Sequence, residues 1–172
     1  MKKLLVIVDM QKDFVDGALG TKEAQAIVEP VAEKIRREKA NGAELVFTLD
    51  THTEDYMNTQ EGKHLPVIHC VKNTPGWMLT KRLQPLAEGE RILEKPTFGS
   101  MELAGKVQQG GYDEIELIGL CTDICVISNA MLVKAAAPEV PVFVDASCCA
   151  GVTPQSHANA LEAMKMCQIG IR

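Results

Sequence analysis

The order of elements along the sequence predicts an α/β fold, a parallel sheet with helices on both of its faces. Apolar runs rich in Val and Ile, such as residues 3–9 and 114–120, are typical of strands that are buried on both sides. Segments bounded by helix caps and breakers follow these runs, and strands that alternate with helices form right-handed βαβ units. The chain has no internal repeat, linker or low-complexity segment, so residues 1–172 are expected to form a single domain.

Four segments are predicted to be helical because caps and breakers bound them. They are residues 21–40, 101–109, 123–137 and 154–167. Thr21 is a typical N-cap residue, and Asn41-Gly42 stops the first helix. Gly110-Gly111 ends the second helix, Pro138 ends the third, and Pro154 suits the first turn of the last.

Six shorter segments are predicted to be strands. They are residues 3–9, 44–50, 91–94, 114–120, 140–145 and 169–171. Residues 10–20 and 52–83 follow neither pattern and are expected to be loops. The second of these is long for a compact domain, and such loops are usually functional.

Composition and charge exclude several classes of protein. The net charge is −5 and the longest basic cluster is residues 34–39, which argues against nucleic acid or an acidic membrane as the main partner. The N-terminal apolar run is short and interrupted by Asp9, and no stretch is long enough to span a membrane. Six cysteines without an export signal or a CxxC pair suggest reduced thiols and a cytoplasmic protein.

Polar residues end several strands at one edge of the predicted sheet. Asp9, Asp50 and Lys95 each close a strand, and the fourth strand leads into Cys125 at the start of a helix. The carboxyl ends of parallel strands meet at the same edge, where α/β proteins bind their ligands. Each residue alone is more often structural, but their convergence points to a site.

The trio of Cys125, Asp9 and Lys95 forms a chemically coherent group for nucleophilic attack on an amide carbonyl. A carboxylate can accept the thiol proton and return it to the leaving amine. An ammonium beside the two groups stabilises the thiolate. Backbone N–H groups at the start of the 123–134 segment are expected to stabilise the tetrahedral oxyanion.

The loop after the second strand is rich in metal-ligand residues. Asp50 and His52 lie at the end of the strand, and three of the four histidines fall between residues 52 and 69. The candidate ligands are Asp50, His52, Glu61, His64 and His69. A mixed nitrogen and oxygen set suits Zn²⁺, Fe²⁺ or Mn²⁺, although scattered polar loop residues explain the pattern equally well.

Four motifs in this order resemble the isochorismatase-like cysteine hydrolases, and within them the nicotinamidase-related amidase branch. They are Asp9-Met10-Gln11-Lys12-Asp13-Phe14, Asp50-Thr51-His52, Lys95-Pro96-Thr97-Phe98, and Gly119 to Val126 (GLCTDICV). The resemblance spans the whole chain. It implies a three-layer α/β/α fold of the Rossmann-like isochorismatase type, with a parallel six-stranded sheet in the order 3-2-1-4-5-6.

The resemblance also implies roles for individual residues. Asp9, Lys95 and Cys125 would form the catalytic triad. A cis peptide would join Leu120 to Cys121, and the backbone N–H groups of Cys121 and Cys125 would form the oxyanion hole. The remaining implied residues are Phe14, Phe98 and Ile124 against the substrate ring and Asp50, His52, Glu61 and His69 around a divalent metal, with His64 in reserve. A small amide substrate and a homo-oligomer are implied as well.

The chain departs from the branch pattern at two positions. Asn58 stands where one form of the branch has a histidine, and Glu61 fits the alternative form with a glutamate farther along. Pro66 stands where an aromatic residue is expected, which Trp77 could replace.

The sheet order also separates Lys95 from Asp9 by two strands, about 10 Å at a spacing of ~4.8 Å. We therefore expect the 95–100 loop to curl over the sheet edge, with Gly99 permitting the turn.

Two other functions remain open at this stage. The first is hydrolysis of another C–N compound, carrying a carbamoyl or ureido group, without a metal. The second is a non-catalytic, redox-sensing protein in which Cys121, Cys125 and Cys148-Cys149 exchange disulfides. A true isochorismatase is disfavoured because that branch generally lacks the nucleophilic cysteine.

Overall fold

The computed structural model describes all 172 residues, and its core is one six-stranded parallel sheet in the order β3-β2-β1-β4-β5-β6. This order confirms the predicted fold class. The strands are β1 (Lys3–Val8), β2 (Glu44–Asp50), β3 (Arg91–Lys95), β4 (Glu114–Leu120), β5 (Val142–Ala150) and β6 (Gly170–Ile171).

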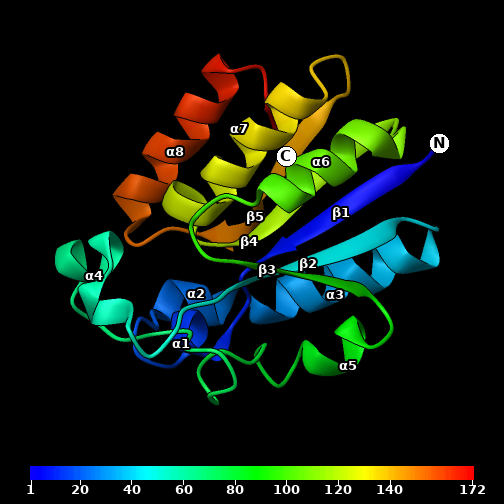
Figure 1. Ribbon diagram of the computed structural model, residues 1–172. Coiled ribbons are helices and arrows are strands. Elements are labelled where there is room, and N and C mark those ends of the chain that lie inside the picture. Colours follow the sequence, from blue (N-terminus) through cyan, green and yellow to red (C-terminus); the bar gives the residue numbers. More distant parts are fainter.

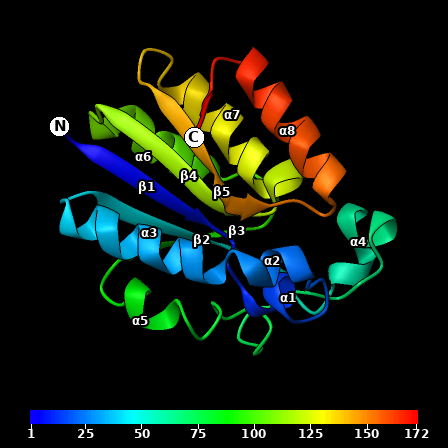
Figure 2. The same cartoon turned by 180° about the vertical axis from the view of Figure 1, so that it is seen from behind.

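Helices cover both faces of the sheet (Figures 1 and 2). The helices are α1 (Lys12–Val15), α2 (Lys22–Ala26), α3 (Val28–Ala40), α4 (Gln60–His64), α5 (Gln84–Ala87), α6 (Met101–Gly110), α7 (Ile127–Ala136) and α8 (Pro154–Met166). A 3₁₀ turn, η1 (Tyr56–Asn58), and a π-helical turn, η2 (Thr122–Val126), complete the elements.

Alternation along β1 divides the apolar interior into two cores. Leu5 and Ile7 belong to the core that includes Val31 and Ile35 of α3. Leu4, Val6 and Val8 belong to the other core, whose helical members are Leu103, Val107, Cys125, Val126, Ala130, Val133 and Met164. Both faces of β1 are therefore buried, which explains its unbroken apolar run.

The single helix predicted over residues 21–40 is wrong in one respect, because the chain breaks at Ile27 between α2 and α3. Thr21 is the N-cap as expected, and its side chain accepts a hydrogen bond from the Ala24 amide. Pro30 explains the break. Its ring would clash with the carbonyl of residue Ala26, four positions earlier, in a continuous helix.

The helix predicted over 123–137 also differs at its start. Residues Thr122–Val126 form a π turn, in which the Val126 amide donates to the Cys121 carbonyl at 3.0 Å, and regular α-helix begins only at Ile127. Single π turns occur frequently at functional sites. Here the wider turn carries Cys125.

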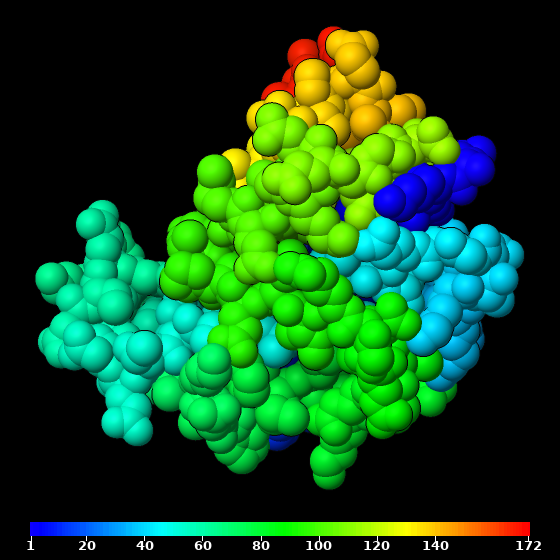
Figure 3. Space-filling view, turned by 45° about the vertical axis from the view of Figure 1, so that its right-hand side comes forward, coloured from blue at the N-terminus to red at the C-terminus, as the bar shows by residue number.

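The predicted loops contain short helices. Residues 10–20 include α1, and residues 52–83 include η1 and α4. In the space-filling view the segment around α4 stands out from the body of the molecule (Figure 3). Strand β5 runs to Ala150 and therefore includes Cys148-Cys149, five residues beyond its predicted end. None of the helices has both the length and the apolar character needed to cross a membrane.

Candidate active site

Asp9, Lys95 and Cys125 meet at the carboxyl edge of the sheet, as the sequence predicted. The Lys95 Nζ lies 2.5 Å from the Asp9 Oδ2 and 3.5 Å from the Cys125 Sγ. All three side chains are at least 96% buried. One ammonium therefore contacts both the carboxylate and the thiol.

Asp9 reaches this position because the chain turns sharply at the end of β1. Its φ is +47°, a left-handed conformation that is uncommon for an aspartate. The Thr48 Oγ1, from the neighbouring strand β2, donates a 2.6 Å hydrogen bond to the Asp9 Oδ1. Thr48 is fully buried and orients the carboxylate. The sequence did not single it out, because it lies within an apolar run.

Lys95 spans the gap to Asp9 in a way the sequence did not predict. It is the last residue of β3, in register with Asp50 of β2, so the 95–100 loop does not carry it over the sheet edge. The extended lysine side chain itself crosses β2. Gly99 has no left-handed φ, so it does not permit a turn in the way expected; a Cβ there would lie 2.6 Å from the Leu132 Cδ1, which would have to move.

Cys125 lies in η2. A cis peptide bond between Leu120 and Cys121, which the family resemblance implied, precedes this turn. The Cys121 amide donates to no acceptor in the protein. Asn129, fully buried one turn after Cys125, donates to the Cys125 carbonyl at 2.8 Å and to the Phe98 carbonyl at 3.1 Å. Asn129 was not predicted from the sequence, because no motif marks it.

Burial sets the proton positions in this trio. It raises the pKa of the Cys125 thiol, and the negative charge of Asp9 raises it further, against the opposing effect of Lys95. Burial also raises the pKa of Asp9 in spite of the lysine. Burial alone would lower the pKa of Lys95, but the charges of Asp9 and Cys125 raise it. The resting thiol is protonated, so attack by Cys125 requires a nearby base.

Asp50, His52, Glu61 and His69 form a second cluster beside the trio. Their ligand atoms all lie within 4.8 Å of one another. Glu61 Oε1 is 3.6 Å from His52 Nε2 and 3.7 Å from His69 Nε2, and Asp50 Oδ2 is 3.5 Å from His69 Nε2. Four ligands at ~2.1 Å around one tetrahedral ion would be ~3.4 Å apart, so these separations fit a divalent metal.

The chain path explains how distant residues reach this cluster. The His52 amide donates to the Cys70 carbonyl at 2.9 Å, which lays the 69–72 segment alongside the end of β2. His69 Nδ1 is 2.8 Å from the Val67 carbonyl, so Nε2 faces the other ligands. Glu61 comes from α4.

Two further residues of the long loop lie outside the cluster. His64 is exposed and its Nδ1 contacts the Gln60 carbonyl within α4. Asn58 contacts Asp55. The set of four expected from the sequence is thus brought together, and the reserve ligand is not.

The two clusters share one contact. Lys95 Nζ is 3.4 Å from Asp50 Oδ1, in addition to its contact with Asp9. Burial works against ionisation of Asp50, but hydrogen bonds from His52 and His69 and the charge of Lys95 hold its pKa well below the usual range. Asp50 is therefore a carboxylate, the form that binds a metal.

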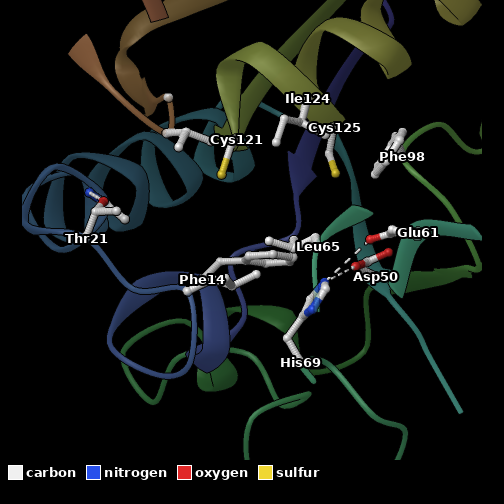
Figure 4. A pocket seen from close by; sticks show the side chains of 14 residues that line it. Phe14, Thr21, Asp50, Glu61, Leu65, His69, Phe98, Cys121, Ile124 and Cys125 are labelled. Atoms are coloured by element: carbon white, nitrogen blue, oxygen red, sulfur yellow. Dashed lines mark hydrogen bonds and ion pairs between the residues drawn. The ribbon is translucent and has the colours of Figure 1, made fainter. Parts of the chain in front are cut away.

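A cavity of about 200 Å³ opens onto both clusters (Figure 4). It is small beside typical ligand pockets of ~300–1,000 Å³. Most of its lining is apolar, and Cys125, Asp50, Glu61 and His69 supply polar atoms. The residues expected against the substrate ring, Phe14, Phe98 and Ile124, all line it, and Phe98 is 41% exposed at the rim.

Cys121, expected from the family resemblance to supply an oxyanion-hole amide, also lines the cavity. The rest of the wall was not predicted, and it comprises Leu19, Thr21, Ala24, Leu65, Gly151 and Val152. The Asp123 carboxylate accepts a hydrogen bond from the Val152 amide at 3.1 Å, which holds this wall against the nucleophile turn. Trp77 is not among the lining residues; its Nε1 donates to the Thr51 Oγ1 at 2.9 Å beside the metal ligands.

All six cysteines are free thiols. Burial raises the pKa of Cys121 to about 12 and also raises the pKa values of Cys148 and Cys149. Since the thiolate is the reactive form, these environments disfavour disulfide exchange as the function.

Comparison with known proteins places this geometry in a family. The model of the Isochorismatase domain matches residues 3–171. The chain belongs to the isochorismatase family. It is 31% identical to an isochorismatase family protein of Bacillus subtilis in an alignment of 173 positions that covers 94% of this chain and 93% of that protein.

Relatives within the isochorismatase family are named for amide hydrolysis. The chain is 26% identical to the nicotinamidase/pyrazinamidase of Mycobacterium tuberculosis, over 97% of this chain and 96% of that protein. The crystal structure of a pyrazinamidase of Pyrococcus horikoshii in complex with zinc is similar at a TM-score of 0.84 and 29% identity. That similarity covers 100% of this chain and 99% of the other. The protein is therefore an isochorismatase-family hydrolase related to nicotinamidases.

Proposed function

We propose that this protein is a metal-assisted cysteine amidohydrolase that acts on a small, uncharged amide, with nicotinamide as the first candidate. Nicotinamide and water would give nicotinate and ammonia. The observation that carries the proposal is the position of Lys95. Its ammonium contacts the proposed base Asp9, and it also contacts Cys125 and Asp50, which both line the cavity.

The first half of the reaction forms a thioester. Asp9 accepts the Cys125 proton as the sulfur bonds to the amide carbon, and Lys95 stabilises the charge on both. The amide oxygen becomes an oxyanion, for which the backbone N–H groups of Cys121 and Cys125 are the assigned donors. When the C–N bond breaks, the proton on Asp9 passes to the nitrogen, and ammonia leaves.

The second half reverses these roles. Asp9 takes a proton from water, and the resulting hydroxide bonds to the thioester carbon. The tetrahedral intermediate collapses with cleavage of the C–S bond. Cys125 regains its proton from Asp9, and the carboxylic acid product leaves. The buried, raised-pKa carboxylate of Asp9 suits both directions of proton transfer.

The four-residue cluster is assigned to the metal. Asp50, His52, Glu61 and His69 present two carboxylates and two imidazoles at separations that suit a divalent ion. A bound Zn²⁺, Fe²⁺ or Mn²⁺ would act as a Lewis acid toward a ring nitrogen of the substrate and so orient it. Phe14 and Ile124 are assigned to the walls that hold the ring, and Phe98 to the rim.

The test is ammonia release from nicotinamide, pyrazinamide and a set of carbamoyl compounds. We expect turnover of a pyridine or pyrazine amide, its loss in Cys125→Ala, and an unchanged circular dichroism spectrum. Cys149→Ala is the matched control, since it removes a thiol that is equally buried but lies outside the cavity. Chelation should lower turnover, and Zn²⁺, Fe²⁺ or Mn²⁺ should restore it.

Two results would contradict the proposal. Full activity of Cys125→Ala would exclude the covalent mechanism. Turnover of carbamoyl compounds alone, by protein that retains no metal, would favour the metal-free C–N hydrolase instead.

A further inference from the structure

The segment that follows Asp9 replaces a piece of the sheet. Val8 pairs with Thr48, and the Asp9 amide donates to the Thr48 carbonyl at 3.2 Å. A continuing strand would next bond both backbone groups of Asp50. The left-handed turn at Asp9 takes the backbone away before it can do so. Asp50 then needs other partners on this side for its N–H and C=O.

The Gln11 side chain supplies both missing hydrogen bonds. Its Oε1 accepts from the Asp50 amide at 2.8 Å, and its Nε2 donates to the Asp50 carbonyl at 2.8 Å. The same Nε2 donates to the Trp77 carbonyl at 2.9 Å. Gln11 is fully buried and does not line the cavity. The side-chain amide of Gln11 therefore replaces the hydrogen bonds of a neighbouring strand and holds the backbone of Asp50, a proposed metal ligand.

Asp13 holds the backbone next to a second proposed ligand, His69. Its Oδ2 accepts a 2.8 Å hydrogen bond from the amide of Cys70, the residue after His69. Its own amide donates to the Gly76 carbonyl at 3.0 Å. A side chain at Gly76 would place a Cβ 2.1 Å from the Asp13 Oδ2, so only glycine allows this approach. The loop that carries His69 is thereby pinned to the segment after β1.

We propose that Gln11 and Asp13 are positioning residues that hold the metal ligands Asp50 and His69 in place. Both belong to the five-residue segment that begins with Asp9, so the proton acceptor and the metal centre share one scaffold. Neither residue lines the cavity; Gln11 acts through the backbone of Asp50, and Asp13 acts through the backbone of Cys70, the residue after His69. The inference rests on the metal site of the proposed function. It adds to that site two residues, Gln11 and Asp13, that lie outside the cluster of four proposed ligands.

The test measures metal binding rather than turnover. We would compare wild type with Gln11→Met, which keeps the length and burial of the side chain but removes its hydrogen bonds. The dissociation constant for Zn²⁺, from chelator competition, is expected to rise about 10–100-fold. The visible absorption of the Co²⁺-loaded protein should change, because the ligand geometry changes. Gln84→Met is the control, since the Gln84 Nε2 donates to Leu79 in the same loop, away from the ligands.

A second pair of variants keeps the test independent of folding in Gln11→Met. Asp13 is half-buried. Asp13→Ala removes the acceptor for the Cys70 amide and should weaken Zn²⁺ binding by a similar factor. Asp13→Asn retains an acceptor oxygen and should restore affinity to within a few-fold of wild type.

The failures are distinguishable. If Gln11→Met and Asp13→Ala lose thermal stability but bind Zn²⁺ with wild-type affinity and an unchanged Co²⁺ spectrum, the two residues are merely structural and the inference is wrong. If wild-type protein binds neither Zn²⁺ nor Co²⁺, the metal-assisted function and this inference both fall. Loss of metal affinity with full amidase activity would support the inference and overturn metal assistance.

Discussion

Lys95 is the residue on which the site depends most. Its ammonium is 99% buried and lies within 3.5 Å of Asp9, Cys125 and Asp50. A buried charge is costly unless it is paired. The carboxylates of Asp9 and Asp50 supply that pairing. The contact with the Cys125 Sγ brings the same positive charge to the thiol.

Replacement of Asp9 by asparagine separates the two roles of this carboxylate. Asp9→Asn is isosteric but cannot accept the thiol proton, and we expect turnover to fall by about 10²–10⁴. Because the Asp9 charge raises the pKa of Cys125, its removal should lower that pKa and increase the thiolate fraction at neutral pH. Alkylation of Cys125 by iodoacetamide, followed by mass spectrometry, should therefore become faster. A parallel fall of both rates would contradict this assignment.

The sequence predicted which candidate catalytic residues come together better than it predicted the residues that hold them. Asp9, Lys95 and Cys125 carry distinctive chemistry at strand ends, so convergence at the sheet edge was foreseeable. Thr48 and Asn129 act through single hydrogen bonds from within apolar segments. Such bonds depend on side-chain distances across elements, which motif spacing does not encode.

Two elements, β1 and β4, lie in close contact at the pair Val8 and Gly119, near the carboxyl edge of the sheet. Gly119 is the last residue of β4 that pairs with β1; its φ is +116°, and a Cβ there would lie 2.2 Å from the Val8 carbonyl oxygen. Only glycine satisfies both the conformation and the contact. The strand can therefore lie against β1 one residue before Asp9.

A pair of glycine variants tests this contact. Gly119→Ala should lower the free energy of unfolding by at least about 2 kcal/mol, because it adds both steric overlap and backbone strain. Gly105→Ala, inside α6 with no heavy atom within 4 Å of the added Cβ, should raise it by about 0.5–1 kcal/mol. Urea denaturation measures both. Equal stabilities of the two variants would show that the close approach is relaxed in solution.

Element boundaries were predictable where a local signal existed. Gly110-Gly111 ended α6 as expected, with Gly111 in the left-handed conformation of a C-cap. The break between α2 and α3 also has a local cause, Pro30. It was not predicted, because Thr21 and Asn41-Gly42 mark the two ends of one longer helix. The extension of β5 to Ala150 depends on pairing with β4 and had no local signal.

At the scale of the whole molecule, ionic groups lie at both ends of the sheet. Opposite the active site, fully buried Glu116 of β4 contacts Lys3 at 2.6 Å and Lys34 at 2.7 Å, and Lys34 also reaches Asp145. The order of the sheet was predictable from family motifs, but this cluster was not. Its members lie far apart in the sequence, and Glu116 is hidden in an apolar run. A homo-oligomer and a cytoplasmic location stay predictions.

The buried thiols make stability depend on pH on the alkaline side. Burial raises the pKa values of Cys70, Cys121, Cys125 and Cys149. Above the reference pKa of about 8.5 the unfolded chain loses these protons while the folded state keeps them. The folded state then binds more protons, so stability is full below that pH and falls as pH rises, by up to ~1.4 kcal/mol per pH unit for each thiol.

Urea denaturation at intervals from pH 7 to pH 10 checks this dependence. Cys149→Ala should reduce the slope by up to ~1.4 kcal/mol per pH unit, the share of one thiol. The packing that Cys149→Ala removes does not depend on pH, so its loss lowers the free energy of unfolding by the same amount at every pH and leaves the slope unchanged. A variant curve parallel to that of wild type would show that Cys149 ionises as readily in the folded state as in the unfolded chain.

The position of Trp77 gives the protein a built-in optical probe. It is the only tryptophan in the chain. Its indole N–H bonds to Thr51, between the ligands Asp50 and His52, and its carbonyl accepts from Gln11. Because the indole bonds to the residue between two proposed metal ligands, we expect a rearrangement of Asp50 or His52 on metal binding to change its environment. Its emission can therefore report metal loading in unlabelled protein, with no competing tryptophan signal.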